Sequence, residues 1–344
     1  MKLKTLLPLV TVAAASAMVA AGCGGASDST TAAPSGSGGG GKTTSSLSLV
    51  AYSTPEVVYD QIIPDFGATP EGKGVGFKTS YGASGDQSRA VEAGQKADVV
   101  ALSLAPDVDR LVKANLVPKD WVAQTEAAGG TGGFVTTSLV SFVVRKGNPK
   151  GIKGWDDLLK PGVKVVTPNP FTSGAAKWNI LGAYQHGGLG YVRKLLTDHV
   201  PVQPKSGREA LQTFTGGEGD VLISYEYEYA TAVKKGEKGL QLVQPQDTFL
   251  IQNPIAATTA APAAGKAFVK FALSDAAQQH FADWGYRPVN AAIFAKNKAK
   301  FPDPKTVKTI DQYGGWSKVN DQLFDPVKGS VAKIEDAAGV STAK

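Results

Sequence analysis

Strand-like and helix-like segments alternate from residue 47 onward, and this alternation limits the fold more than any other feature of the sequence. Strands that alternate with helices form parallel sheets, because each helix carries the chain back across a sheet face. The sequence therefore predicts an α/β fold. The expected strands span residues 47–52, 75–81, 98–102, 138–145, 163–167, 220–225 and 240–243. The expected helices span residues 56–66, 87–94, 106–115, 155–159, 174–185 and 225–235, before a mostly helical region over 261–338.

Small loops that carry hydroxyl groups join several of these strands to the helices that follow. Ser53 comes after the first strand, Ser84 after the second, and Ser173 before the helix expected at 174. Open α/β sheets bind ligands at the carboxyl ends of their strands. A helix start there offers unpaired N–H groups and the positive end of the helix dipole. One such serine is an ordinary N-cap, but three in one chain indicate an anion site that needs no Lys or Arg.

The first 22 residues have the pattern of a secretory signal peptide. Lys2 and Lys4 precede an uncharged, mostly apolar stretch over 6–21 that ends in small residues, and a polar, Gly-rich tract follows at once. Residues 20–23, Ala-Ala-Gly-Cys, resemble the lipobox of bacterial lipoproteins, with Ala20 where Leu is more usual. We therefore expect Cys23, the only cysteine, to be lipidated. The expected location is the bacterial cell envelope, on the outer face of the cytoplasmic membrane or in the periplasm.

A flexible linker is predicted over residues 23–46, which after Cys23 are mainly Gly, Ser, Thr and Ala and cannot bury a core. Residues 36–43 match the phosphate-loop pattern letter for letter. That pattern binds phosphate only between a buried strand and a helix, and neither is expected here. We therefore do not assign a nucleotide site.

Charge and motifs exclude several classes of function. The formal net charge is +6, and it falls to +4 when Lys2 and Lys4 leave with the leader, which is a mild excess spread along the chain rather than a nucleic-acid stripe. The three histidines, His186, His199 and His280, are scattered, and the sequence holds no Gly-x-Ser-x-Gly, His-Glu-x-x-His or Cys-x-x-Cys motif. We expect no enzyme activity, cofactor, metal or nucleic-acid partner.

Several segments carry a family resemblance, in order, over nearly everything after residue 47. They are Ser-Gly-Asp-Gln at 84–87, Ala-Asp-Val-Val-Ala-Leu at 97–102, Arg-Lys-Gly-Asn-Pro-Lys at 145–150, Trp-Asp-Asp-Leu at 155–158, Val-Thr-Pro-Asn-Pro at 166–170, Ser-Gly-Ala-Ala-Lys-Trp-Asn at 173–179, Gly-Asp-Val-Leu-Ile at 219–223, Tyr-Arg-Pro at 286–288 and Gly-Gly-Trp at 314–316. Together they resemble the bacterial sulfate-binding and thiosulfate-binding proteins that serve ABC importers.

The resemblance implies a type II periplasmic-binding-protein fold, in which two α/β lobes close over a ligand. One lobe would comprise residues 47–135 plus 250–344, and the other residues 136–249. The implied function is that of a monomeric lipoprotein that captures sulfate, or thiosulfate, and delivers it to the membrane permease of an ABC transporter.

In this family backbone N–H groups, hydroxyls and one indole hold the dianion without a counter-charge. Carried over by position, the substrate-binding residues are Ser53, Ser84, Ser173, Gly174, Ala175, Gly207, Arg208 and Tyr225. Three positions depart from the family: Tyr225 replaces the indole, Ser53 an acidic residue and Ala175 a glycine. A site of donors alone suits sulfate, whereas a protonated phosphate needs an acceptor. Asp86 beside Ser84 could be that acceptor, so a phosphate- or molybdate-binding protein of the same fold is the alternative.

Overall fold

The computed structural model describes residues 30–32 and 44–342. The expected signal peptide, the expected lipidation site Cys23 and most of the expected linker lie outside the described residues. Inside the expected linker, Thr30–Ala32 form strand β1, which pairs antiparallel with residues 78–80. A part of this segment is therefore a strand, where the sequence suggested only flexible coil.

The strands expected from the sequence are all present. The described strands are β1 (Thr30–Ala32), β2 (Ser45–Tyr52), β3 (Val75–Gly82), β4 (Val99–Ala101), β5 (Phe134–Arg145), β6 (Val165–Val166), β7 (Val221–Tyr225), β8 (Leu240–Val243), β9 (Asp247–Ala257), β10 (Arg287–Pro288) and β11 (Thr306–Lys308). Strands β4 and β7 are buried at every position, and β2 is buried from Leu47 onward, which explains their continuous apolar runs.

The expected helices are present with shifted ends, whereas the helices at residues 122–126 and 207–215 were not expected. The α-helices are α1 (Glu56–Gly67), α2 (Ser84–Glu92), α3 (Ala105–Lys113), α4 (Val122–Glu126), α5 (Gly174–Lys194), α6 (Gly207–Thr215), α7 (Glu226–Lys234), α8 (Ala263–Ala272), α9 (Asp275–Asp283), α10 (Ala291–Asn297), α11 (Gly315–Val319) and α12 (Ser330–Ala337). Shorter helical turns span Trp155–Leu159, Leu195–His199, Lys298–Lys300, Ile310–Tyr313 and Asn320–Phe324. Helix α5 continues past the expected end through a break at Gly187 and Gly188, where Gly188 has φ 64°. No described helix combines the length and hydropathy needed to span a bilayer.

The sheet is mixed rather than purely parallel. Its strand order is β1-β3-β2-β4-β9-β5-β7-β6, with β8 and β10 on β5 and β11 on β9. Strand β2 pairs parallel with β3 and β4, and β6 pairs parallel with β7, as the alternation with helices predicts. The pairs β4–β9, β9–β5 and β5–β7 are antiparallel. Strand β9 was not expected, because Pro254 lies within it and proline is unusual inside a strand.

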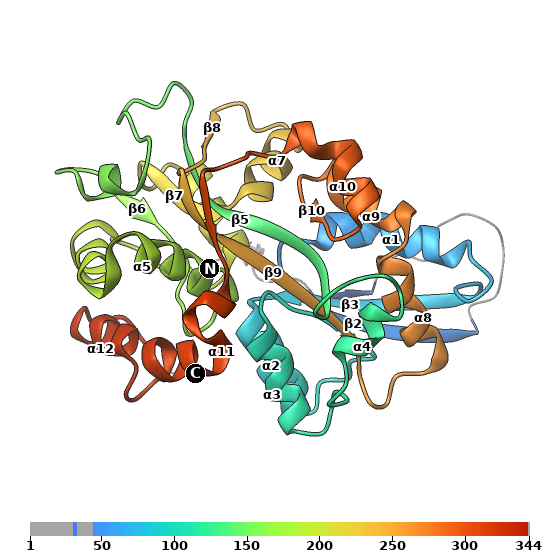
Figure 1. Ribbon diagram of the computed structural model, residues 1–344. Coiled ribbons are helices and arrows are strands. Elements are labelled where there is room, and N and C mark those ends of the chain that lie inside the picture. The colour runs from blue at the N-terminus through green and yellow to red at the C-terminus, as the bar shows by residue number, and fades with distance from the viewer. Residues whose placement is uncertain (1–29, 33–43, 343–344) are drawn as a thin grey trace, which may run out of the picture.

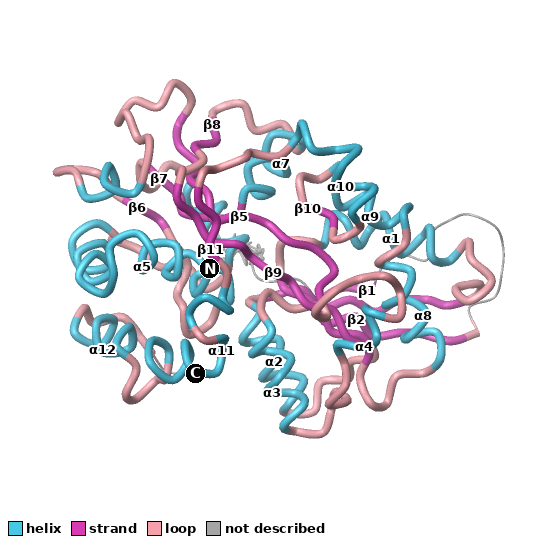
Figure 2. The backbone as a smooth tube through the Cα atoms, in the orientation of Figure 1, coloured by secondary structure: helices cyan, strands magenta, loops and turns pink. Residues whose placement is uncertain are grey.

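Strands β5 and β9 connect two groups of strands (Figures 1 and 2). Residues 134–139 of β5 pair with β9, whereas residues 140–145 pair with β7 and β8. Strand β9 in turn pairs with β4 through residues 255–257. One group, β1 to β4, is therefore joined to the other, β6 to β8, through these two long strands.

The C-terminal region is mostly helical, as expected, and also contains the short strands β10 and β11. The last part of this region lies against the segments that precede α5 and α6. Glu335 on α12 accepts a hydrogen bond from Gln203 at 2.8 Å, and Asn169 donates to the carbonyl of Ser341 at 3.0 Å. Helix α12 lies beside α5 in Figure 1. The end of the chain therefore packs on the group containing β6 and β7 rather than on β1 to β4.

Candidate anion-binding site

A single pocket collects loops from both groups of strands. Its lining comes from the last residues of β2, β3 and β7, from residues that follow β2, β3 and β4, and from the starts of α2, α5, α6 and α7. The lining residues are Tyr52, Ser53, Thr54, Gly82, Ala83, Ser84, Ser103, Ser173, Gly174, Ala175, Gly207, Ser224, Tyr225 and Glu228. Because parallel strands β2, β3 and β4 end at the same edge, their loops meet at one place.

Seven of the eight residues expected in the site line this pocket: Ser53, Ser84, Ser173, Gly174, Ala175, Gly207 and Tyr225. The eighth, Arg208, is not among the lining residues. Its guanidinium group instead donates hydrogen bonds to the carbonyl of Ser53 and to the carboxylate of Glu56. The side chain of Arg208 therefore ties the start of α6 to the loop after β2.

Three helices have their first residue in the pocket lining. Helix α2 starts at Ser84, α5 at Gly174 and α6 at Gly207, and each preceding residue has extended backbone. The N–H groups of a first helical turn have no acceptor within the helix, and the helix dipole places partial positive charge there. One of these groups, Gly85 N–H, donates to the carbonyl of Thr172 at 3.1 Å. The remaining free N–H groups and the dipoles of these helices favour negative charge in the pocket without a cationic side chain.

The start of α5 approaches the loop after β4 closely. A Cβ atom at Gly174 would lie 2.7 Å from Ser103 Oγ and 2.7 Å from Leu104 Cδ2, distances that real Cβ atoms essentially never show. A side chain at 174 would therefore force Ser103 or Leu104 to shift, so glycine allows the two groups of strands to meet closely around the pocket.

Ser103 was not among the expected site residues, although it follows an expected strand just as Ser53 and Ser84 do. Its Oγ lies 2.6 Å from the hydroxyl of Tyr225, and its N–H donates to Ser84 Oγ at 2.9 Å. Its carbonyl accepts from Trp178 Nε1 and Asn253 Nδ2, both at 2.9 Å. Ser103 thus links the two groups of strands within the pocket.

Tyr225 occupies the position where the resemblance implies an indole. Its side chain is buried, and burial raises the pKa of its phenol well above the usual value of 10. The phenol therefore keeps its proton at any physiological pH. The hydrogen bond to Ser103 fixes the position of the hydroxyl group in the pocket wall.

The hydroxyl of Ser84 is already used within the protein. It donates to Asp107 Oδ2 at 2.6 Å while it accepts from the backbone of Ser103. The buried carboxylate of Asp107 thereby orients Ser84. The donors that α2 can present to a ligand are therefore backbone N–H groups rather than this hydroxyl.

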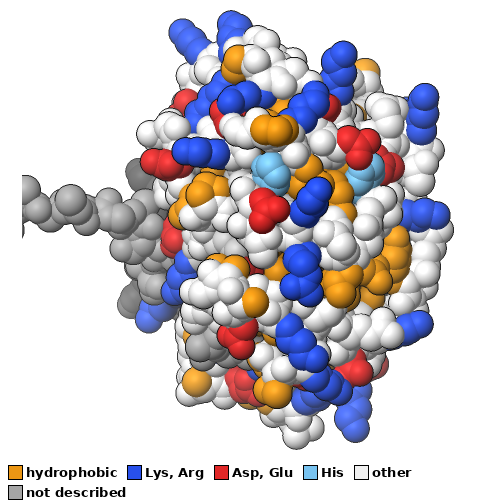
Figure 3. Space-filling view, turned by 90° about the vertical axis from the view of Figure 1, so that its left-hand side faces the viewer, with side chains coloured by type: hydrophobic (Ala, Val, Ile, Leu, Met, Phe, Trp, Pro, Cys, Tyr) orange, Lys and Arg blue, Asp and Glu red, His pale blue; other side chains and the backbone are white. Residues whose placement is uncertain are grey.

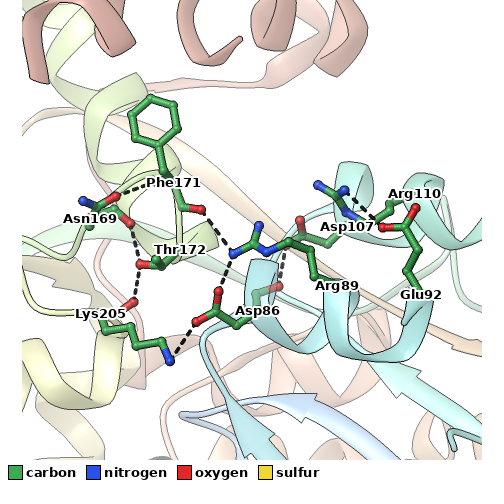
Figure 4. A network of polar contacts seen from close by, with 10 residues as sticks. Asp86, Arg89, Glu92, Asp107, Arg110, Asn169, Phe171, Thr172 and Lys205 are labelled. Carbon is green, nitrogen blue, oxygen red and sulfur yellow. Dashed lines mark hydrogen bonds and ion pairs between the residues drawn. The ribbon is translucent and has the colours of Figure 1, made fainter. Parts of the chain in front are cut away.

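Asp86, expected as a possible acceptor, lies outside the pocket lining. Its carboxylate forms ion pairs with Arg89 and, at 3.0 Å, with Lys205 (Figure 4). Arg89 also reaches the carbonyl of Phe171 at 3.4 Å. These contacts join α2 to the segments before α5 and α6, so Asp86 holds the two sides of the protein together beside the pocket.

The carboxylate that does line the pocket is Glu228, which the sequence analysis missed. It is 3% exposed, and its Oε1 atom has no hydrogen-bond partner among the described residues. Burial raises the pKa of its carboxyl group to about 7, although Arg208, Lys235 and a hydrogen bond with Thr54 each lower that pKa. An acidic residue near the start of a helix is normally a solvated side chain that the helix dipole stabilises. Nothing in the sequence therefore indicated that Glu228 lines the pocket.

The outer surface carries both signs of charge. On the face shown in Figure 3, Lys and Arg side chains are spread among acidic ones rather than gathered into one stripe. This distribution on that face agrees with the mild positive excess counted from the sequence.

Comparison with known proteins agrees with the resemblance. Residues 47–287 match the family model described as bacterial extracellular solute-binding protein. The sulfate-binding protein of Synechococcus elongatus is 40% identical over 296 residues, covering 81% of this chain and 83% of that protein. The thiosulfate-binding protein of Pseudomonas aeruginosa is 33% identical over 308 residues, covering 80% and 91%. The solved structure of the sulfate-binding protein SubI from Mycobacterium tuberculosis has 45% identity and a TM-score of 0.77, covering 82% and 100%. The expected resemblance and the type II periplasmic-binding-protein fold are thus confirmed.

Proposed function

Because this chain belongs to the bacterial extracellular solute-binding protein family, with sulfate- and thiosulfate-binding relatives along most of its length, we propose that it is the sulfate receptor of an ABC importer. In this proposal the ion binds in the pocket at the ends of β2, β3, β4 and β7, and the loaded protein delivers it to the membrane permease. The relatives are named as binding proteins rather than enzymes, in agreement with the absence of catalytic motifs from the sequence.

The observation that carries the proposal is the composition of the pocket wall. None of its described lining residues is Lys, Arg or His, yet three helix starts and several hydroxyl groups meet there. Sulfate is fully ionised near neutrality and can only accept hydrogen bonds. Each hydrogen bond to a charged group contributes about 1.5–3 kcal/mol. A few such bonds are enough to offset the costs of desolvation and ordering.

The phosphate alternative has lost its first support. It rested on Asp86 as an acceptor, and Asp86 is occupied by Arg89 and Lys205 outside the pocket lining. The acceptor that remains for a protonated phosphate is the buried carboxyl group of Glu228 in the pocket lining, and the phosphate titration tests it. Molybdate, like sulfate, is a tetrahedral dianion, so its rejection or acceptance depends on the size of the closed pocket and is decided by titration.

Calorimetric titration of the purified protein with sulfate, thiosulfate, molybdate and phosphate tests the proposal. We expect saturable binding of sulfate, with phosphate far weaker at neutral pH because it carries a proton. Tight phosphate binding without sulfate binding would overturn the substrate assignment. The thiosulfate titration decides which of the two sulfur oxyanions the pocket prefers.

The lobe assignment is also part of the proposal. Residues 47–135 plus 250–344 would form one lobe and residues 136–249 the other, with the pocket between them. The paths of β5 and β9 support this division. The packing of α12 on α5 suggests moving the last residues to the second lobe. Small-angle scattering with and without sulfate would test it, since relative rotation of two lobes changes the radius of gyration.

We further propose that the mature protein is a monomer attached to the membrane through a lipid on Cys23, with the linker as a tether. The leader and the lipobox-like residues 20–23 support this. The family description places relatives outside the bacterial cytoplasm. Mass spectrometry of the mature N-terminus, with Cys23→Ser as the control that should release the protein from membranes, tests the anchor.

A further inference from the structure

Strand β1 lies at the edge of the sheet, beside β3 (Figure 2). Strand β3 pairs with β2 on one side and with β1 on the other, and no other described strand pairs with that second side. An open strand edge presents unpaired N–H and C=O groups, and a strand from the linker pairs with some of them. The residues of β1 therefore attach the linker to the folded body.

The composition of the linker favours a strand at this place. Thr30 and Thr31 are the only β-branched residues between positions 24 and 42, and such residues are enriched in strands. Pro34 follows them, and proline has no N–H group to offer to a neighbouring strand. The sequence thus supports a short strand where the structure has one.

The pairing register decides on which side of the folded body the linker is attached. Ser45, at the start of β2, lies opposite Val75, at the end of the sheet away from the pocket. Thr30 lies opposite Ser80, two residues before Gly82, which lines the pocket. Because β1 is antiparallel to β3, its N-terminal end points toward the pocket end of the sheet. The step from residue 75 to residue 80 corresponds to about 17 Å along the strand.

Covalent geometry limits how far Cys23 can lie from β1. A chain spans at most about 3.4 Å per residue, so Cys23 lies within about 25 Å of Thr30. If the linker were attached only at Thr44, the same limit would be about 70 Å. For chains that behave as flexible coils, the root-mean-square spans are about 15 Å and about 25 Å. Strand β1 therefore shortens the tether and moves its attachment point toward the pocket.

We propose that β1 docks the linker on β3 so that a lipid on Cys23 holds the pocket end of the protein toward the membrane. This inference rests on the proposed lipid anchor and adds the orientation of the anchored protein. The surface that faces the bilayer then includes the ends of β2 and β3 and the starts of α1 and α2, whereas residues 72–75 face away. A permease in the same membrane meets the pocket end of the protein rather than its back.

Two insertions test the path of the linker in the lipidated full-length protein on phosphatidylcholine vesicles. Ten Gly and Ser residues between Gly25 and Ala26 precede β1, and they should raise the root-mean-square span of the tether from about 15 Å to about 23 Å. The same ten residues between Gly39 and Gly40 lie between β1 and β2 in the sequence, so they should leave the distance from the bilayer unchanged. Energy transfer from a dye on the protein to acceptor lipids measures this distance.

Two labelling positions test the orientation. Asp60→Cys places the dye near the start of α1, which begins beside the pocket end of β2. Lys73→Cys places the dye just before β3, at the opposite end. Both residues are exposed, and the lipid leaves no free thiol on Cys23. We expect more energy transfer from position 60 than from position 73, and the first insertion should reduce the difference.

Proline substitutions in the linker provide a matched pair of variants. Thr30→Pro with Ala32→Pro removes two N–H groups from β1 and should release it from β3. Hydrogen exchange within residues 78–80 should then become faster, and the second insertion should lengthen the tether as the first does. Ala26→Pro with Asp28→Pro adds two prolines outside β1 and should cause neither change.

The outcomes separate this inference from the proposal on which it rests. Equal effects of the two insertions in the protein without prolines, or equal energy transfer from positions 60 and 73, overturn the inference and leave sulfate binding and the anchor intact. Mass spectrometry that finds no lipid on Cys23 overturns the proposed anchor, and the inference with it.

Discussion

Replacing Tyr225 by Phe removes one hydroxyl group from the pocket wall and keeps the ring in place. The phenol is buried, keeps its proton and lies 2.6 Å from Ser103 Oγ. If it donates to bound sulfate, its loss removes a hydrogen bond to a charged group, worth about 1.5–3 kcal/mol. The dissociation constant of sulfate should then rise roughly 10- to 150-fold. Stability should also fall by about 1–3 kcal/mol, because Ser103 loses its partner.

A double-mutant cycle with Ser103→Ala separates these two effects. The backbone of Ser103 is held by Trp178 and Asn253, so removing its hydroxyl should leave the loop in place. We expect Ser103→Ala to weaken sulfate binding by less than Tyr225→Phe, because it removes only a neutral hydrogen bond, worth about 0.5–1.5 kcal/mol. The double variant should lose little more than Tyr225→Phe alone, since the serine acts through the phenol.

Tyr191→Phe is the matched control. Tyr191 is buried and donates to the carbonyl of Trp155 at 2.5 Å, away from the pocket lining. It should lose stability in urea without any change in sulfate affinity. Unchanged affinity in Tyr225→Phe, measured by calorimetry, would refute the assignment of this phenol as a ligand donor.

Three further changes test other parts of the structure. Ser173→Asp should abolish sulfate binding and retain the thermal transition, because Asp is favoured at the N-cap position as Ser is but places a carboxylate against the ion; wild-type affinity would move the site elsewhere. Gly174→Ala should cost about 1–3 kcal/mol in urea unfolding, since its Cβ meets Ser103 at 2.7 Å. A Cβ added at Gly190 on the same helix would have no atom within 4 Å, so Gly190→Ala should cost far less stability. Equal losses in the two variants would argue against the close approach of Gly174 to Ser103. Burial raises the pKa of Glu335 from 4.5 to about 7, so the folded state holds this proton more tightly and loses stability as the pH rises from 4.5 to 7. Glu335→Gln should remove up to about 3 kcal/mol of that loss, and identical slopes of unfolding free energy against pH in both proteins would contradict this.

The sequence was most informative where local chemistry and position agree. The apolar runs of β2, β4 and β7 are buried as expected, and the serines after strands identified much of the pocket. Ser103 could have been found by the same reasoning, because it follows the strand expected at 98–102.

Other features depend on contacts between distant segments, which a single sequence does not reveal. Glu228 looks like a solvated acid until α7 is placed against the loop after β2. Asp86 looks like a pocket acceptor until Lys205 is placed beside it. The side chain of Arg208 reaches Ser53 across 155 residues of sequence, a contact that no local pattern specifies.

The path of β5 and β9 has a mechanical consequence. Any motion that opens the pocket between α2 and α5 must bend these two hydrogen-bonded strands, because both run from one group of strands to the other. We expect these two strands to act as a hinge that bends while the hydrogen bonds between them stay in place. A side chain also links the two strands, since Thr248 Oγ1 on β9 donates to the carbonyl of Val140 on β5. The stiffness of these two strands contributes to the free energy that ion binding must supply to keep the pocket closed. Substitutions in β5 or β9 can therefore change the affinity for the ion without altering a pocket residue.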